Sequence, residues 1–127
     1  GMLDGIGLRR ISAPTTARSD TDVSVSLTYE MWRNNGKDAI AFVHALDAAG
    51  RMVAQDDHAP VGGHYPTDLW RPGECVTESF TLRLPTGVDS PVRLVTGFYE
   101  SATHERFVTG TPNNTIDIGE LGVLPKQ

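Results

Sequence analysis

The densest group of residues able to do chemistry lies between positions 56 and 70, with His44 close by in the preceding segment. The group combines carboxylates, imidazoles and large aromatic rings: Asp56, Asp57, His58, His64, Tyr65, Asp68 and Trp70. Carboxylates and imidazoles are the ligands of a divalent metal, but this spacing matches no zinc motif. We therefore predict no metal site and no cofactor. Asp57 and Asp68 are expected to be turn residues that hydrogen-bond their own backbone.

The aromatic residues of the same stretch allow a second interpretation. Aromatic faces on a loop can stack on sugar rings while neighbouring polar side chains bind hydroxyl groups. The candidate ligand-binding residues are His58, His64, Tyr65 and Trp70. The competing interpretation, which we favour for Trp70, is that this indole plugs the end of the fold, because large aromatic side chains are well buried on average.

Motifs for catalysis are missing from the chain. The sequence has no Gly-x-Ser-x-Gly elbow, no Walker loop and no His-Glu-x-x-His pattern. Cys75 is the only cysteine, which excludes an intrachain disulfide, and we expect it to be a buried structural thiol. No catalytic residues are predicted, and the chain is not expected to be an enzyme.

Composition and charge exclude other classes of function. The 127 residues have a formal net charge of −5, and the 11 basic residues are scattered singly apart from Arg9-Arg10. Nucleic acid is therefore an improbable partner, because no basic stripe exists to contact phosphates. No apolar run approaches the roughly 18 residues that a membrane-spanning helix needs. Gly1 before Met2 has the form of a residue left by tag cleavage, so we expect a single domain over residues 2–127 that begins at a native Met.

The secondary structure that must position these residues is predicted by alternating hydrophobicity. From Val23 to Trp32, apolar residues alternate with serine, threonine and glutamate, which is typical of a strand with one buried and one wet face. Val76–Leu84 shows the same period, although Glu78 interrupts its apolar face and suggests an edge position. Short strands are also expected over 6–11, 92–100, 106–109 and 116–123, with loops over 12–22 and 57–73.

The segment Ala39–Asp47 is apolar on both faces and is predicted to be a central strand. His44 alternates with Phe42 and Leu46, so we expect it to point into the core as a hydrogen-bonded structural histidine. The turn Asp47-Ala48-Ala49-Gly50 then sends residues 51–56 back as a hairpin. Seven or eight short strands without helical periodicity predict an all-β fold, an antiparallel β-sandwich of immunoglobulin-like or jelly-roll type.

Four stretches of the chain carry a family resemblance: FVHALDAAGRMVAQ from residue 42, GHYPTDLWRPGE from residue 63, LRLP from residue 82 and GFY from residue 97. Over about residues 23–108 the chain resembles an accessory β-sandwich module of bacterial surface proteins and of membrane glycosyltransferases of the dolichyl-phosphate-mannose-dependent type. Similar modules carry Thr-Gly-Glu-Arg where this chain has Thr103-His104-Glu105-Arg106, so the last turn is expected to differ. The resemblance implies an extracytoplasmic setting, whereas residues 2–20 lack a secretory apolar segment, so the location stays open.

These observations predict a non-catalytic β-sandwich module with a structural or protein-interaction role. A carbohydrate-binding module that uses the loop aromatics is the alternative, and an enzyme with a loop-built site is the third possibility. A protein or a carbohydrate is the partner to expect. An exposed Trp70 would favour sugar binding, whereas a buried one would favour a structural role.

Overall fold

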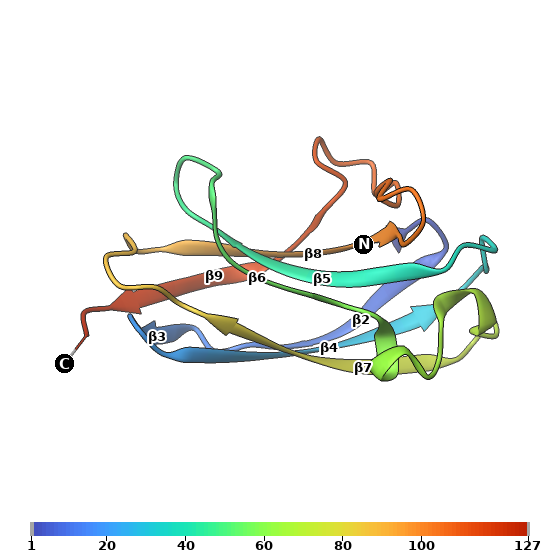
Figure 1. The fold of residues 1–127 in the computed structure, drawn as a ribbon, viewed down its shortest axis with the longest axis horizontal. Helices are drawn as coiled ribbons and strands as arrows, with labels where there is room; N and C mark the ends of the chain where they lie inside the picture. The colour runs from blue at the N-terminus through green and yellow to red at the C-terminus, as the bar shows by residue number, and fades with distance from the viewer. Residues whose placement is uncertain (1, 127) are drawn as a thin grey trace.

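The protein is a sandwich of two β-sheets, seen in a computed structural model that describes residues 2–126 (Figure 1). One sheet has the order β1 (Met2–Leu3), β2 (Ile6–Ser12), β4 (Asp22–Met31) and β7 (Cys75–Arg83). The other has the order β3 (Thr16–Arg18), β9 (Ile116–Leu124), β8 (Val92–Glu100), β5 (Ala39–Leu46) and β6 (Met52–His58). The predicted all-β sandwich is confirmed, and the immunoglobulin-like alternative describes it.

The pairing is antiparallel throughout, except that β3 runs parallel to β9. Strand β3 lies in a segment expected to be loop, and β1 was not predicted either, because two or three residues are too few to show a period. The strand expected over 106–109 does not form, and only an isolated bridge joins Tyr99 to Arg106. Here the chain leaves the sheet, since Phe107 turns inward and packs on Phe98 with ring centroids 5.8 Å apart.

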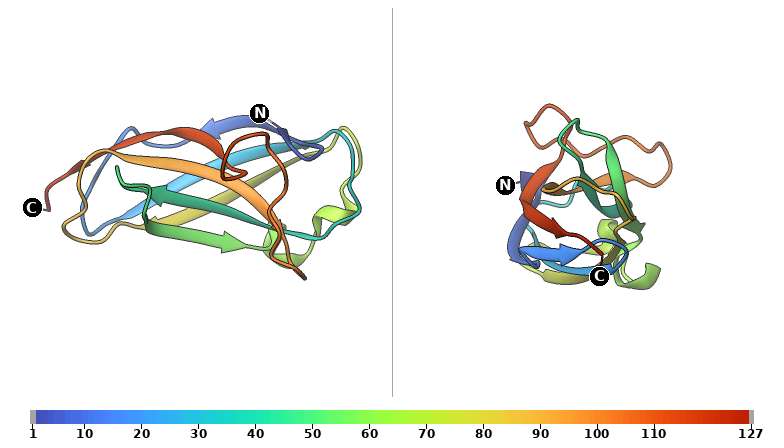
Figure 2. Two further views of the ribbon diagram at one scale, coloured as in Figure 1. Left: turned by 90° about the horizontal axis from the view of Figure 1, so that it is seen from above. Right: turned by 90° about the vertical axis from the view of Figure 1, so that its left-hand side faces the viewer.

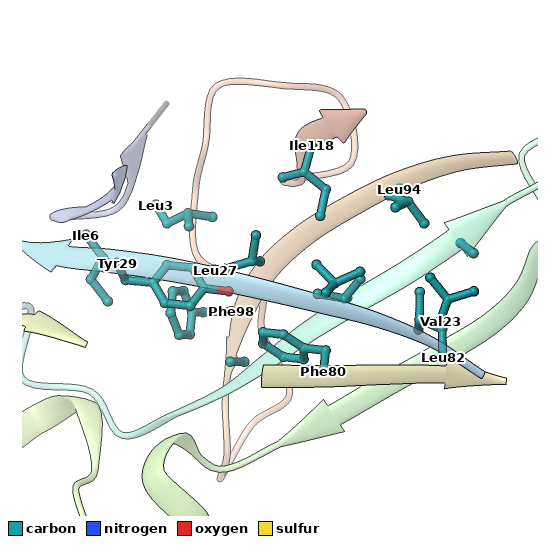
Figure 3. Packing of buried hydrophobic residues seen from close by; sticks show 14 of the residues in the cluster. Leu3, Ile6, Val23, Leu27, Tyr29, Phe80, Leu82, Leu94, Phe98 and Ile118 are labelled. Atoms are coloured by element: carbon teal, nitrogen blue, oxygen red, sulfur yellow. The ribbon is translucent and has the colours of Figure 1, made fainter. Parts of the chain in front are cut away.

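The hydrophobic core lies between the sheets and follows the predicted alternation (Figure 3). Strands β4 and β7 contribute their alternate apolar residues from the four-stranded sheet, and β8 does the same from the facing sheet: Val23, Val25, Leu27, Tyr29, Met31, Val76, Phe80, Leu82, Val92, Leu94 and Phe98. The Tyr29 hydroxyl and Thr96 Oγ1 lie 2.8 Å apart across the sheets, and Thr96 Oγ1 also donates to the Phe42 carbonyl at 2.8 Å. This polar link is fully hydrogen-bonded, as a buried polar group must be.

Strand β5 has two buried faces, as predicted, but its orientation is the reverse of the expected one. Its small residues Ala39, Ala41, Val43 and Ala45 face the core, while Phe42 and His44 lie on the outer face of the five-stranded sheet. The prediction that His44 points into the core is therefore wrong. Phe42 is buried although it lies outside the main core, because the segment 101–115 between β8 and β9 folds back above this face (Figure 2).

Turn chemistry and strand alternation account for two further features. Asp47 Oδ1 accepts the backbone N–H groups of Ala49 and Arg51, and Gly50 has a φ of 81°, so the predicted hairpin turn is confirmed. Cys75 is exposed rather than buried. Its neighbour Val76 faces the core, so the period of two turns the thiol outward.

Candidate functional site

The structure does not gather the predicted site residues into one cluster. Asp57 lies within β6 rather than in a turn, so its side chain points away from those of Asp56 and His58. Asp68 is exposed in the short 3₁₀ turn Thr67–Leu69, which follows the turn Pro60–Gly63. Within residues 2–126, no three histidine, cysteine, aspartate or glutamate side chains are arranged to hold a metal ion.

Trp70 closes the end of the sandwich, as favoured from the sequence. The side chain is 1% exposed, its Nε1 donates to the Tyr65 carbonyl at 2.8 Å, and its ring meets Phe98 edge-on at 6.3 Å. The loop above it is tied to the strands because the Asn34 amide donates to the carbonyls of Thr67 and Trp70, at 3.1 and 2.9 Å. The buried indole offers no open face to a sugar.

Tyr65 and His64 lie beside this plug. The Tyr65 hydroxyl donates to Glu74, and this hydrogen bond lowers the pKa of Glu74 and raises that of Tyr65. Glu74 also accepts the Arg71 N–H at 2.6 Å, so Tyr65 and Glu74 fix the chain where it enters β7. His64 is exposed and follows two glycines with positive φ, Gly62 and Gly63. Ligand binding by His58, His64 and Tyr65 stays a prediction.

His58 belongs to an edge clasp formed by Asp56, His58 and Glu78, where β6 and β7 approach each other. His58 Nδ1 lies 2.9 Å from Asp56 Oδ1, and Asp56 Oδ2 accepts the Thr81 N–H at 2.8 Å across the two sheets. Glu78 accepts the N–H of Val61, and its Oε1 lies 3.7 Å from His58 Nε2. The clasp explains why a glutamate interrupts the apolar face of β7, which is indeed an edge strand.

A second cluster, which we call the Asp57 hollow, opens on the outer face of the five-stranded sheet. Its volume is about 230 Å³, and it is lined by His44, Asp57, Tyr99, His104 and Arg106. Asp57 Oδ1 lies 3.0 Å from His44 Nε2, and Asp57 Oδ2 accepts the Tyr99 hydroxyl at 3.2 Å. Strands β5, β6 and β8 and the segment 101–115 thus all contribute side chains to the hollow.

The buried ring of Phe42 lies beneath three of the residues that line the Asp57 hollow. Its ring stacks on His44 at 4.3 Å and on Tyr99 at 6.1 Å, and the Arg106 guanidinium lies 4.9 Å above it. Gly97 is the partner of Phe42 on β8, and a Cβ there would lie 2.5 Å from Phe42 Cζ. The missing side chain of Gly97 therefore makes the space that the Phe42 ring occupies.

The electrostatics of the hollow set the protonation of His44. Burial lowers the pKa of His44, the Asp57 carboxylate opposes that shift, and the nearby Arg106 charge adds to it. His44 is then neutral at pH 7, so Nε2–H donates to Asp57 and Nδ1 is left as an acceptor. Burial and the Asp57 charge raise the pKa of Tyr99, which keeps its hydroxyl a donor. Arg106 supplies the fixed positive charge.

We expect His44 in the folded protein to titrate below its ordinary pKa of 6.5. Because the unfolded chain then binds more protons, the stability contributed by neutral His44 is complete above about pH 6.5 and is lost as pH falls through the folded pKa. Asp57→Asn should lower the pKa of His44 further, since it removes the opposing charge. An NMR titration of the His44 ring protons measures both values, and a wild-type pKa at or above 6.5 would contradict this assignment.

The turn that carries His104 places a residue other than glycine in a left-handed conformation. His104 has a φ of 64°, a left-handed conformation that glycine adopts more easily. Its N–H donates to the Glu100 carbonyl at 2.8 Å, and its ring meets Tyr99 edge-on at 5.7 Å. This chain therefore places an imidazole at the rim of the hollow at a position where glycine would leave it bare.

Three members of the hollow, Tyr99, His104 and Arg106, were not predicted from the sequence. They lie more than 40 residues along the chain from Asp57, and nothing in their local pattern marks them as its neighbours. A larger hollow of about 380 Å³ lies beside the β5–β6 hairpin, but its charged residues are already paired. Arg93 Nη2 forms an ion pair with Glu120 Oε1 at 2.9 Å, and Arg51 Nε forms one with Asp47 Oδ2 at 3.0 Å.

Comparisons with known proteins support the fold. No protein-family model matches the chain, and no curated protein matches its sequence. Among solved structures, a β-glucuronidase of glycoside hydrolase family 2 is similar over 94% of this chain and 11% of its own, with 13% identity and a TM-score of 0.60. A β-glucosidase from Listeria innocua in complex with isofagomine is similar over 95% of this chain and 16% of its own, with 16% identity and a TM-score of 0.51.

A third similar structure is the CARDB domain of a Pyrococcus furiosus protein, solved in complex with di-metal ions. It covers 94% of this chain and 87% of its own, with 12% identity and a TM-score of 0.55. At these identities the similarities show a shared β-sandwich fold. The link to membrane glycosyltransferases stays a prediction, and no helix within residues 2–126 has the length and apolar character to span a bilayer.

Proposed function

We propose that this β-sandwich is a non-catalytic module that works by binding, and that the Asp57 hollow is its contact site. The observation that carries the proposal is the convergence of His44, Asp57 and Tyr99 with two groups from the segment 101–115 on one open hollow. Both oxygens of the Asp57 carboxylate are already hydrogen-bonded, one to His44 and the other to Tyr99, before any ligand binds. Such preorganisation lowers the entropic cost of binding.

The arrangement favours recognition over reaction. An Asp–His pair activates a nucleophile only when a hydroxyl or thiol lies within reach of the imidazole. The members of the Asp57 hollow include no serine, threonine or cysteine, and its one hydroxyl, on Tyr99, donates to Asp57. His44 Nδ1 and Asp57 accept hydrogen bonds, whereas Arg106 donates them. A polar group that both donates and accepts would therefore bind here.

The fold comparisons are consistent with a role inside a larger protein. In the two glycoside hydrolases, the part similar to this chain is a small fraction of the whole, 11% and 16% of their lengths. Of the structural and protein-interaction roles predicted from the sequence, the proposal takes the interaction role. Carbohydrate binding through the loop now depends on His58, His64 and Tyr65, since Trp70 is buried.

A thermal-shift screen tests the proposal, using mono- and oligosaccharides, free amino acids and short polar peptides at millimolar concentrations. A compound that binds the folded state at ten times its Kd adds about 1.4 kcal/mol and raises the melting temperature. We expect that rise to be lost in Asp57→Asn and His104→Gly, and kept in the control His64→Ala. His104→Gly removes the imidazole while it relieves the positive φ.

Three outcomes would contradict the proposal. The first is the absence of any shift across the panel, which would make the hollow a structural clamp on the segment 101–115. The second is a shift that Asp57→Asn keeps and His64→Ala abolishes, which would assign binding to the loop. The third is consumption of a panel compound by the wild type but not by His44→Gln, which would establish an enzyme.

A further inference from the structure

The outer face of the four-stranded sheet carries an exposed tryptophan that the binding site around Asp57 does not use. Trp32 follows β4, and its side chain is 62% exposed, in contrast to the buried Trp70. It borders a hollow of about 200 Å³ that is lined by Met2, Gly7, Leu8, Arg9, Glu30 and Trp32. We call this place the Trp32 platform.

Gly7 of β2 leaves the space in which the Trp32 indole lies. A Cβ added to Gly7 would lie 2.7 Å from Trp32 Nε1 and 3.1 Å from Cδ1, so the indole lies directly against the β2 backbone. The Trp32 N–H also donates to the Gly5 carbonyl at 2.8 Å, which anchors the residue beyond the end of β4. One side of the ring is thus supported by the sheet, and most of its surface remains in water.

A matched donor and acceptor lie beside the ring. Arg9 Nη1 and Glu30 Oε1 are 2.7 Å apart, and both residues border the same hollow as Trp32, which follows β4 two residues after Glu30. The Arg9 side chain is largely exposed, so most of its donors are unused. The pair carries no net charge, so it favours neither an anion nor a cation.

We propose that the Trp32 platform binds a neutral sugar ring. The apolar C–H face of a pyranose would stack on the indole, and its hydroxyls would donate to Glu30 and accept from Arg9. An apolar partner would leave both charged groups desolvated and unsatisfied. The hollow is smaller than the roughly 300–1,000 Å³ of pockets for drug-sized ligands, so a single ring is the expected occupant.

Packing alone does not account for this arrangement. An indole that served only to cover Gly7 would be expected to bury most of its area, as Trp70 does at the end of the sandwich. The middle of this face carries serine and threonine on β4 and β7, among which Thr28 and Thr77 hydrogen-bond each other at 2.8 Å. Trp32 is the aromatic group that stands on it.

Acrylamide quenching of tryptophan fluorescence tests the proposal on the full chain. Trp32 is exposed to the quencher and Trp70 is protected, so a bound sugar should lower the quenching of the accessible fraction. The probes are neutral gluco-, xylo-, manno- and N-acetylglucosamine oligosaccharides, with glucuronate oligosaccharides as the charged arm. We expect saturable protection by at least one neutral series and little by the charged one.

Variants separate the platform from the rest of the molecule. Gly7→Ala keeps the indole but displaces it, and should weaken binding of the protecting sugar by about tenfold or more. Glu30→Gln should also weaken binding of this sugar, and it leaves the position of the Trp32 indole unchanged. The exposed control Leu69→Ala and the hollow variant Asp57→Asn should protect Trp32 with the same sugar affinity as the wild type. Loss of binding at the Trp32 platform can therefore be told apart from loss of binding at the Asp57 hollow.

The proposal is overturned if no neutral series protects Trp32 at tens of millimolar. It is also overturned if protection is unchanged in both Gly7→Ala and Glu30→Gln, or if the charged arm protects better than every neutral one. A heteronuclear NMR spectrum of each variant confirms that it is folded, and the indole N–H resonance of Trp32 gives a second reading of binding.

Discussion

Trp70→Ala is expected to lower the free energy of unfolding by about 3–5 kcal/mol, the usual cost of removing a buried tryptophan. The indole is 1% exposed and contacts Phe98, and its Nε1 donates to the Tyr65 carbonyl at 2.8 Å. Truncation would leave a cavity at the end of the sandwich and an unpaired carbonyl above it. Urea denaturation followed by circular dichroism measures the loss.

The neighbouring residue provides the control. Leu69 is 60% exposed, so Leu69→Ala should change stability by no more than about 0.5 kcal/mol. A Trp70→Ala variant as stable as Leu69→Ala would show that the indole is not a plug, and would reopen the loop as a stacking site for sugars.

Gly97→Ala is expected to destabilise the protein by about 1–3 kcal/mol through overpacking. The new methyl would lie 2.5 Å from Phe42 Cζ, 2.8 Å from Cε2 and 3.2 Å from the Asn114 carbonyl oxygen. The Phe42 ring has little room to yield, since His44, Tyr99 and Arg106 surround it. Because that ring stacks on His44, the NMR signals of His44 should shift as well.

Two comparisons make this result specific. Gly122→Ala, in the adjacent strand β9, would place its methyl 3.5 Å from the nearest atoms and should be nearly neutral. In a Phe42→Leu background the cost of Gly97→Ala should shrink, because the shorter side chain removes the overlap. Equal costs in both backgrounds would show that Phe42 is not the source of the strain.

The strands that the sequence predicts best are those with one wet face. Residues 23–32 and 76–84 alternate cleanly, since one side of each strand meets the core and the other meets water. The orientation of β5 could not be predicted, because both of its faces are apolar. The segment that buries Phe42 from outside comes from far along the chain, and the choice of alanines for the inner face depends on how closely the sheets pack.

The candidate site was predicted less well than the fold. The local run from Asp56 to Trp70 suggested one cluster, but strand alternation sends Asp57 to one side of β6 and Asp56 and His58 to the other. The members of the Asp57 hollow are brought together by pairing between distant strands. Trp32 could have been noticed, since it comes two residues after Glu30 in the alternating stretch 23–32.

The most direct test of the central claim is an amide chemical-shift map of the ¹⁵N-labelled protein, titrated with the compound that gives the largest thermal shift. The claim is that this module binds through the outer faces of its sheets and transforms nothing. The map should then show changes clustered around Asp57 and His104, or around Gly7 and Trp32, with the compound recovered intact. Changes confined to residues 58–70, or conversion of the compound to a product, would contradict it.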